Sequence, residues 1–458
     1  MIARARVAAF DVLDAVSAGR ADLPAAIAQA RGTLDDDRDK GLAAEIATGV
    51  ERWRAALDHL IEASAARSID RLDPEIVTIL RLSAYQLLYL TRVPASAVVD
   101  DAVELTRRVK KRSASGFVNA VLRAMPRKPA SLRLPPRPDD VANRTAVLDY
   151  FAITLSHPRW LVTRWYDRLG FDVAERWLQF NNVPARLTLR ANRLKITPTA
   201  LAERLARDGV RVAAGRFAPD ALIVEEGQPL SAHGGEGRPL VDDGWFVVQD
   251  EASQLVSLLA DPATARRVLD TCASPGGKTT AMAAAMADCG LVVACDVRRK
   301  RIDLLKRTVL ASGSASVRIV QADATRPLPF SRPFDRVLLD APCSGLGTLR
   351  RDPDIRWRRG EDDLAALASS QRRMLDHAAA CVAPGGRLIY ATCSSEPEEN
   401  EDVVDRFLVA TAGFARVDAR TIAGVPAEVV DPQGYLRTAP HPHGLEAFFG
   451  AVLERTAH

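Results

Sequence analysis

The sequence predicts an α/β protein whose C-terminal part is a doubly wound, mostly parallel sheet. From residue 266 onward, strand-like and helical segments alternate, which is typical of parallel sheets built from strand–helix–strand units. Residues 141–260 combine short strands with one helix, which indicates a smaller α/β unit before the main sheet. Residues 1–125 show helical periodicity throughout, which predicts an all-α domain at the N-terminus.

The size and composition favour a cytoplasmic protein with several domains. The 458 residues exceed the roughly 250–300 residues at which single cores stop growing. The chain is 47% hydrophobic and 26% charged, which is the profile of a soluble globular protein. No apolar run approaches the roughly 18 residues needed to cross a bilayer, and the N-terminus lacks the features of a secretory signal. We therefore expect no membrane association.

The N-terminal domain is expected to span 1–126. Its stretch LDPEIVTILRLSAYQLLYL begins with Asp73 as a helix N-cap and Pro74 at the first helical position. Apolar residues cover several faces of this helix, so it should lie at the centre of a bundle. A further helix is expected over 113–125, capped by Ser113 or Ser115.

A proline-rich, basic linker over 127–145 and a small α/β subdomain over 146–258 should follow. The linker either acts as a passive spacer or touches phosphates. In the subdomain, LTLRANRL alternates like a strand, and TPTALAERLARDG has a helix start at Thr197 and a stop at Gly209. RVAAG, ALIVEE and WFVVQD look like further short strands.

The catalytic domain is expected over 259–458. RVLDTCA, LVVACDV, VRIVQADA, DRVLLDAP and GRLIYATC are its strand-like segments. In open α/β sheets ligands bind at the carboxyl ends of the strands. The residues that follow these five segments are therefore the candidates for a functional site.

A glycine-rich turn follows the first of these strands, in LDTCASPGGKTTAMA. It matches neither the P-loop nor GxGxxG, but its glycines let the backbone approach a ligand at a helix N-terminus. Asp296 ends the next strand, 20 residues after Gly276, where an acid typically takes ribose hydroxyls. Asp323 and Asp340 end the third and fourth strands. Each aspartate alone could be a helix N-cap, but together they indicate an adenosine-containing ligand.

Two cysteines are expected at the same edge of the sheet. Cys343 follows the fourth strand and Cys393 follows the fifth, and each precedes a serine. A single cysteine is usually a small buried hydrophobe, and Cys289, Cys295 and Cys381 are interpreted in that way. The sequence shows no CxxC pair and no zinc-ligand spacing, so we expect neither a metal site nor a disulfide framework.

Basic residues cluster locally although the net charge is only +4. The clusters are KKR at 110–112, RRKR at 298–301 and RRDPDIRWRR at 350–359. Each could be a solvated face or a nucleic-acid contact, and charge alone does not decide between them.

These motifs resemble those of a known family. Three stretches are similar to the motifs of RNA cytosine-5 methyltransferases that use S-adenosylmethionine: DTCASPGGKT, LLDAPCSGLGTLRRDPDIRW and LIYATCSSEPEENEDVV. VPASAVVDDAVELTRR and GFVNAVLRAMPR resemble the NusB-like domain of one branch, the 16S ribosomal RNA methyltransferase B (RsmB, Sun or Fmu) family. SHPRWLV and VVQDEASQL resemble further stretches of that family, so the resemblance covers nearly the whole chain.

The resemblance implies a Rossmann-like methyltransferase sheet, preceded by an RRM-like subdomain and a NusB-like RNA-binding domain. It also implies how the cofactor is held. Asp296 would hold the ribose of S-adenosylmethionine and Asp323 the adenine, with Asp340 also at the cofactor site. The methionine part would lie against the turn formed by Cys272, Ala273, Ser274, Pro275, Gly276, Gly277 and Lys278.

The resemblance also assigns the catalytic groups. Cys393 would be the nucleophile that adds to carbon 6 of cytosine, Cys343 would help release the product, and Asp340 would bind or protonate the cytosine edge. The base must leave its stack to reach them. Basic residues beside the site would hold the RNA backbone: Arg350, Arg351, Arg356, Arg358 and Arg359.

One departure from the family pattern lies near the C-terminus. The family usually reads Asp-Gly-Phe-Phe where this chain has Glu446 and Ala447 before the two phenylalanines. That motif is expected on the closing strand, so packing or substrate contact is affected there, and not the reaction.

The resemblance implies that the substrate is a cytosine of 16S rRNA, methylated before the subunit is assembled. We expect a monomer. Alternatives are the same reaction on tRNA or 23S rRNA, or a non-catalytic NusB-like RNA-binding scaffold. A DNA cytosine-5 methyltransferase would use Cys343 as nucleophile and would not need Cys393. A dinucleotide dehydrogenase is disfavoured because the turn lacks GxGxxG.

Overall fold

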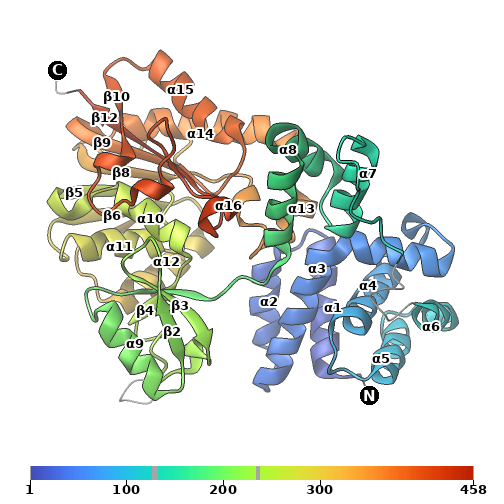
Figure 1. Cartoon of the computed structure of the whole chain (residues 1–458). Coiled ribbons are helices and arrows are strands. Elements are labelled where there is room, and N and C mark those ends of the chain that lie inside the picture. The colour runs from blue at the N-terminus through green and yellow to red at the C-terminus, as the bar shows by residue number, and fades with distance from the viewer. Residues whose placement is uncertain (1, 126–132, 234–237, 457–458) are drawn as a thin grey trace. The chain divides into compact units, whose positions relative to one another are not determined.

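The computed structural model describes residues 2–125, 133–233 and 238–456, which form two compact units (Figure 1). The N-terminal unit comprises Met1–Pro184 together with Leu349–Glu361. The C-terminal unit comprises Ala185–Thr348 together with Asp362–His458. These bounds differ from the predicted ones, because two helices after the linker and a segment from inside the predicted catalytic domain belong to the N-terminal unit. In the described ranges, no helix is long and apolar enough to cross a membrane.

The described part of the N-terminal unit is helical, as predicted for residues 1–126; residues 146–184, which were predicted to belong to the small α/β subdomain, are helical too. Asp73 and Pro74 begin α4, and its residues Ile76, Leu80 and Ala84 are at most 3% exposed, so this helix lies in the core of the bundle. The helices are α1 (Arg4–Ser17), α2 (Leu23–Arg31), α3 (Asp37–Ala65), α4 (Pro74–Tyr89), α5 (Ala95–Arg108), α6 (Ser115–Ala124), α7 (Arg144–Asp149), α8 (Arg159–Asn182) and α13 (Ile355–Arg358).

Two details of this unit differ from the predictions. The predicted serine cap of α6 is wrong: the N-cap is Ala114, without a side-chain hydrogen bond, because a 3₁₀ turn at Arg112–Ala114 leads directly into the helix. Residues 127–132 of the predicted linker lie outside the described residues. The described remainder is not a passive spacer, because Arg137 pairs with Glu175 of α8 at 2.8 Å.

The C-terminal unit begins with a small antiparallel sheet of order β2-β3-β1-β4. As predicted, Thr197 caps its helix, accepting a hydrogen bond from the Ala200 backbone, and Gly209 adopts a left-handed conformation (φ 74°) just after the helix. The elements are β1 (Thr188–Ala191), α9 (Pro198–Arg207), β2 (Arg211–Ala214), β3 (Ala221–Glu226) and β4 (Phe246–Val248).

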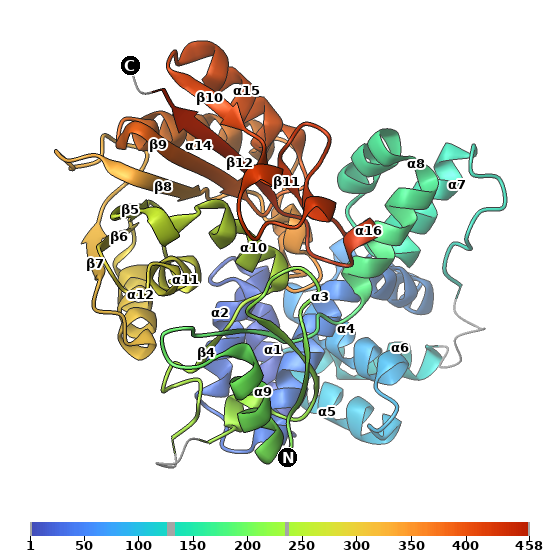
Figure 2. The ribbon, with the colours of Figure 1, turned by 60° about the vertical axis from the view of Figure 1, so that its left-hand side comes forward.

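The main sheet has the order β10-β12-β9-β8-β5-β6-β7, with β11 pairing with β12. The five predicted strands pair in parallel, and β10, β11 and β12 add an antiparallel edge, so the sheet is mostly parallel as predicted (Figure 2). The strands are β5 (Arg267–Asp270), β6 (Leu291–Asp296), β7 (Val317–Gln321), β8 (Phe334–Asp340), β9 (Val382–Thr392), β10 (Phe414–Val417), β11 (Leu436–Arg437) and β12 (Phe449–Arg455).

Helices cover both faces of the main sheet. Because successive strand residues point to opposite faces, Val268 joins the core under α10 to α12, whereas Leu269 joins the core under α14 and α15. This burial on both faces explains why the central strands are nearly continuous apolar runs. The helices are α10 (Glu251–Leu259), α11 (Gly277–Ala285), α12 (Arg299–Ser312), α14 (Asp363–Ala379), α15 (Glu401–Ala410) and α16 (Pro440–His443).

The three cysteines interpreted as core residues have different environments. Cys295 and Cys381 are buried, as predicted, at 0% and 6% exposure. Cys289 is exposed, so its prediction is wrong. The reason is that α11 ends at Ala285, and the tight turn that follows places Cys289 on the surface between helix and strand.

Candidate active site

The glycine-rich turn after β5 is held close to the sheet. The backbone N–H of Ala273 donates to the carbonyl of Cys295 on β6, at 2.8 Å. Gly276 is the N-cap of α11 with φ 109°, and a Cβ there would lie 2.9 Å from Leu305 Cδ1. Only glycine fits this conformation without strain. The turn therefore lies at the carboxyl ends of two neighbouring parallel strands, where ligands bind in such sheets.

The predicted acids lie along the same edge. Asp296 is the last residue of β6 and is 4% exposed, and its carboxylate accepts from the Arg298 backbone and pairs with Arg301 at 3.3 Å. Asp323 lies two residues beyond β7 instead of ending it. Hydrogen bonds from the hydroxyl and backbone of Thr325 lower the pKa of Asp323, so this carboxylate also stabilises its own turn.

Asp340, the last residue of β8, forms an ion pair with Lys278 of α11. The Lys278 ammonium lies 2.7 Å from the carboxylate and 5.8 Å from the centre of the Phe448 ring. Burial lowers the pKa of Lys278, but attraction to Asp340, then Asp250 and Cys393, outweighs burial and leaves the pKa raised. Lys278 is therefore a cation that acts on both Asp340 and Cys393, a role that sequence reasoning missed.

The two predicted thiols meet at this edge. Cys343 follows β8 and Cys393 follows β9, and their sulfur atoms lie 3.2 Å apart. The backbones of the two loops are also joined, because the N–H of Gly347 donates to the carbonyl of Cys393 at 2.9 Å. The hydrogen bond with Cys393, together with burial, raises the pKa of Cys343 well above its ordinary value. The two sulfurs therefore share a hydrogen bond in which either thiol can be the donor.

Glu399 connects the two thiol loops through hydrogen bonds. Its role was not predicted from the sequence. Its side chain is fully buried and accepts from the Ser344 backbone at 2.8 Å, from Gln371 at 2.9 Å and from the Ser394 hydroxyl at 2.6 Å. The two serines that follow Cys393 are buried, because Ser394 is 2% and Ser395 9% exposed. Ser394 lies in the interior because its hydroxyl donates to the buried Glu399.

Asp270, at the end of β5, is a second group without a predicted role. It is 1% exposed, and one oxygen accepts from the Thr279 hydroxyl at 2.7 Å. Among the described residues, its other oxygen has no hydrogen-bond partner. Burial raises the pKa of Asp270 to about 7, with the Thr279 hydrogen bond opposing the change.

We expect Asp270→Asn to change how stability depends on pH. Between about pH 4 and pH 7 the native Asp270 keeps a proton that the unfolded chain has released, so native stability falls as the pH rises through this range. The variant lacks this loss and should melt several degrees above the parent protein at pH 8, with a smaller difference at pH 5. Thermal melts from pH 4 to pH 8 measure the effect. Parallel curves for both proteins would contradict it.

The departure at Glu446 and Ala447 lies just before β12 and not on it, because the strand begins at Phe449. Both side chains are buried, at 2% and 3% exposure. The N–H of Ala447 donates to the carbonyl of Gly347, and a Cβ on Gly347 would lie 2.0 Å from the Ala447 carbonyl. The segment therefore packs tightly against the Cys343 loop.

The predicted RNA-contacting arginines all lie in the segment Leu349–Glu361, which belongs to the N-terminal unit. Arg350 stacks on Phe180, 4.1 Å from its centre, and Arg358 pairs with Asp354 at 3.0 Å. Arg351 and Arg359 also interact with other groups of the protein.

Arg356 does not belong among the predicted RNA-contacting arginines. It is fully buried, and its guanidinium donates to the carbonyl of Ser156 at 2.9 Å and to Asn182 at 3.0 Å. Burial lowers its pKa to about 9. Its guanidinium has no surface left for an RNA phosphate, and the arginine is part of the core of its unit.

Comparison with known families matches three parts of the chain. The model for 16S rRNA methyltransferase RsmB/F matches residues 257–454, and the NusB family model matches residues 3–127. The ferredoxin-like domain of RsmF/B-like methyltransferases matches residues 157–231.

Individual relatives match the chain over most of its length. Ribosomal RNA small subunit methyltransferase B of Pseudomonas putida is 35% identical over 92% of both chains. The protein of the same name from Pseudomonas syringae pv. tomato is 34% identical over 99% of this chain and 97% of its own.

Two solved structures resemble the fold. The crystal structure of PH0851 has a TM-score of 0.80 and 26% identity, and the match covers 99% of each chain. A methyltransferase homologue from Pyrococcus horikoshii has a TM-score of 0.57 and 25% identity, over 68% of this chain and 99% of its own.

Proposed function

Because the chain belongs to the 16S rRNA methyltransferase RsmB/F family, we propose that it methylates carbon 5 of a cytosine in 16S rRNA, using S-adenosylmethionine. The observation that carries the chemistry is the pair of thiols 3.2 Å apart at the carboxyl ends of β8 and β9. The RNA would be bound before the small subunit is assembled, by a monomer in the cytoplasm.

The residues along the sheet edge fit S-adenosylmethionine. The buried carboxylate of Asp296 would accept hydrogen bonds from the ribose hydroxyls, and Asp323 would accept from the adenine. The turn from Cys272 to Lys278 would hold the methionine part against α11. When bound, S-adenosylmethionine supplies an electrophilic methyl group.

Cys393 would act as the nucleophile. Carbon 5 of cytosine is a poor nucleophile, but addition of the Cys393 thiolate to carbon 6 forms an S–C bond and moves electron density to carbon 5. The positive charge of Lys278 interacts with Cys393. Asp340, held by Lys278, would hydrogen-bond the cytosine edge at nitrogen 3 or at the amino group as charge develops there.

Cys343 would complete the cycle. After carbon 5 gains its methyl group, its proton must leave and the bond between Cys393 and carbon 6 must break. The hydrogen bond with Cys393 is the largest cause of the raised pKa of Cys343. Once Cys393 is bonded to carbon 6, Cys343 would release its own proton to solvent. Its thiolate would then take the carbon 5 proton, directly or through water, while the bond between Cys393 and carbon 6 breaks and Cys393 leaves as a thiolate.

Bisulfite sequencing tests the proposed substrate. RNA is taken from a strain lacking the protein, from its parent and from the lacking strain complemented with the intact gene. One 16S cytosine should be protected in the parent and in the complemented strain, and converted in the strain lacking the protein. A protected cytosine lost from tRNA or 23S rRNA would instead assign the activity to that RNA. Identical patterns in every RNA would refute a methyltransferase and favour a scaffold.

A further inference from the structure

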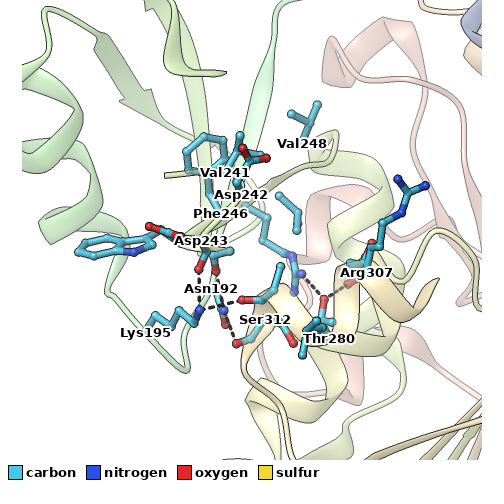
Figure 3. A pocket seen from close by; sticks show the side chains of 18 of the residues that line it. Asn192, Lys195, Val241, Asp242, Asp243, Phe246, Val248, Thr280, Arg307 and Ser312 are labelled. Atoms are coloured by element: carbon cyan, nitrogen blue, oxygen red, sulfur yellow. Dashed lines mark hydrogen bonds between the residues drawn. The ribbon is translucent and has the colours of Figure 1, made fainter. Parts of the chain in front are cut away.

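A large cavity lies in the C-terminal unit, apart from the thiols. Its volume is 1110 Å³, and its walls come from β1, β4 and their loops on one side and from α11 and α12 on the other (Figure 3). Its lining contains Pro275, Gly277 and Thr280 of the glycine-rich turn and helix. The thiols, Asp296 and Asp340 are not part of its lining, so the cavity shares only the glycine-rich turn and helix with the candidate active site.

Arg190 of β1 is a buried cation in the wall of this cavity. The residue is 4% exposed, and its guanidinium donates to the Thr280 hydroxyl at 2.9 Å, which is a neutral partner. Among the described residues, its Nε has no hydrogen-bond partner. Burial lowers the pKa of Arg190 to about 10, and attraction to Asp220 only partly offsets this effect. Buried charges are normally paired, so this wall lacks an anion.

Further cations line the same cavity. Lys195 donates to the backbone carbonyls of Asp243 and Ala311, at 2.5 and 2.7 Å, and Arg307 reaches the cavity from α12. Arg238 pairs with Asp243 at 3.4 Å, which leaves Asp242 as the other carboxylate of the lining. The cations outnumber the carboxylates, and the lining also includes an aromatic ring, that of Trp245.

We propose that this cavity binds a phosphate group, with Arg190 as its buried partner and Arg307 at its entrance. A phosphodiester of an RNA strand and the phosphate of a free nucleotide share this chemistry, and the cavity has room for a whole nucleotide with its base against Trp245. Only the choice of RNA as the source rests on the proposed function. An RNA strand held here would be anchored beside the turn that leads into α11.

The test measures binding without any methyl transfer. Fluorescence anisotropy with a labelled 12-nucleotide single-stranded RNA is recorded at several salt concentrations, for the whole protein and three variants. Arg190→Met removes the buried cation, and Arg307→Gln removes an exposed one. Lys306→Gln is the matched control. Lys306 is the exposed neighbour of Arg307 on α12, and it does not line the cavity. Competition with adenosine monophosphate distinguishes an RNA strand from a free nucleotide.

We expect Arg190→Met to weaken RNA binding by about 10-fold or more, since hydrogen bonds to charged groups are worth about 1.5–3 kcal/mol. Arg307→Gln should reduce the slope of log affinity against log salt by about 0.7. Lys306→Gln should leave both quantities unchanged. If Arg190→Met and Arg307→Gln lose only their affinity for adenosine monophosphate and bind RNA as the parent does, the cavity is a site for free nucleotides.

Two results would overturn the inference. One is that Arg190→Met and Arg307→Gln bind RNA and nucleotide as tightly as the parent. The other is that Lys306→Gln loses as much affinity as Arg307→Gln. Thermal melts show whether Arg190→Met is folded, and Arg307→Gln tests the cavity independently because its side chain is exposed. A protein that fails to methylate cytosine but loses RNA binding in these variants would refute the proposed function and leave this inference standing.

Discussion

Cys393→Ala is expected to abolish both methyl transfer and the covalent complex with RNA, because no bond to carbon 6 can form without its sulfur. Cys343→Ala is expected to give the opposite result for the complex. The S–C6 bond still forms in this variant, but the group that accepts the carbon 5 proton is missing, so RNA should remain attached. Denaturing gels of labelled RNA and incorporation of radioactive methyl groups measure the two effects.

Cys289→Ala is the matched control for both variants. Its thiol is exposed and lies in a turn outside the glycine-rich loop and the two thiol loops, so the variant should keep full activity and form no trapped complex. Full activity of Cys393→Ala would refute the mechanism. A different result would be a covalent RNA complex with Cys393→Ala and none with Cys343→Ala. Cys343 would then be the nucleophile, as in DNA cytosine-5 methyltransferases.

Glu399→Gln is expected to lower kcat by about 100-fold while leaving the affinity for S-adenosylmethionine nearly unchanged. The amide of glutamine can still accept from the Ser344 backbone, but its NH₂ group would replace the oxygen that accepts from Ser394. The loops that carry Cys343 and Cys393 then lose a shared charged acceptor, and displacements near 1 Å in an active site can cost about 10² in rate. Asp296 and the glycine-rich turn do not depend on this carboxylate.

Steady-state kinetics, calorimetry with the cofactor and the rate of complex formation together measure this effect. Asp402→Asn is the matched control, because it makes the same change from acid to amide in the first turn of α15, where the side chain is only partly buried. Equal losses in both variants would indicate a general effect of charge. An unchanged kcat in Glu399→Gln would show that the two serine contacts do not position the thiols.

Strand ends were the most predictable part of the molecule. The apolar runs of a sheet covered on both faces are unmistakable, so the positions of Asp296, Asp340, Cys343 and Cys393 follow from where each run stops. Parallel pairing then places those ends at one edge, which is why the sequence predicts that the two thiols face the same ligand. Their separation of 3.2 Å depends on loop backbones and could not be predicted.

The environment of charged side chains was not predictable from local sequence. The acids after Cys393 look like an exposed helix start, yet Glu399 is fully buried because two loops and α14 converge on it. Arg356 lies in a strongly basic run that is typical of an RNA contact, yet its guanidinium is inside a core. Burial of a charge depends on partners far away in the sequence, and no local pattern encodes them.

Arg356 also has a consequence for the order in which the protein is made. It completes the N-terminal unit by bonding to Ser156 and Asn182, yet it lies in the segment Leu349–Glu361. A ribosome adding about 5–20 residues per second needs on the order of ten seconds or more between Pro184 and Glu361. During that interval the helices of the N-terminal unit emerge without the side chain that donates to Ser156 and Asn182. The fold that begins with residues 1–184 is therefore complete only after residues 349–361 have been made.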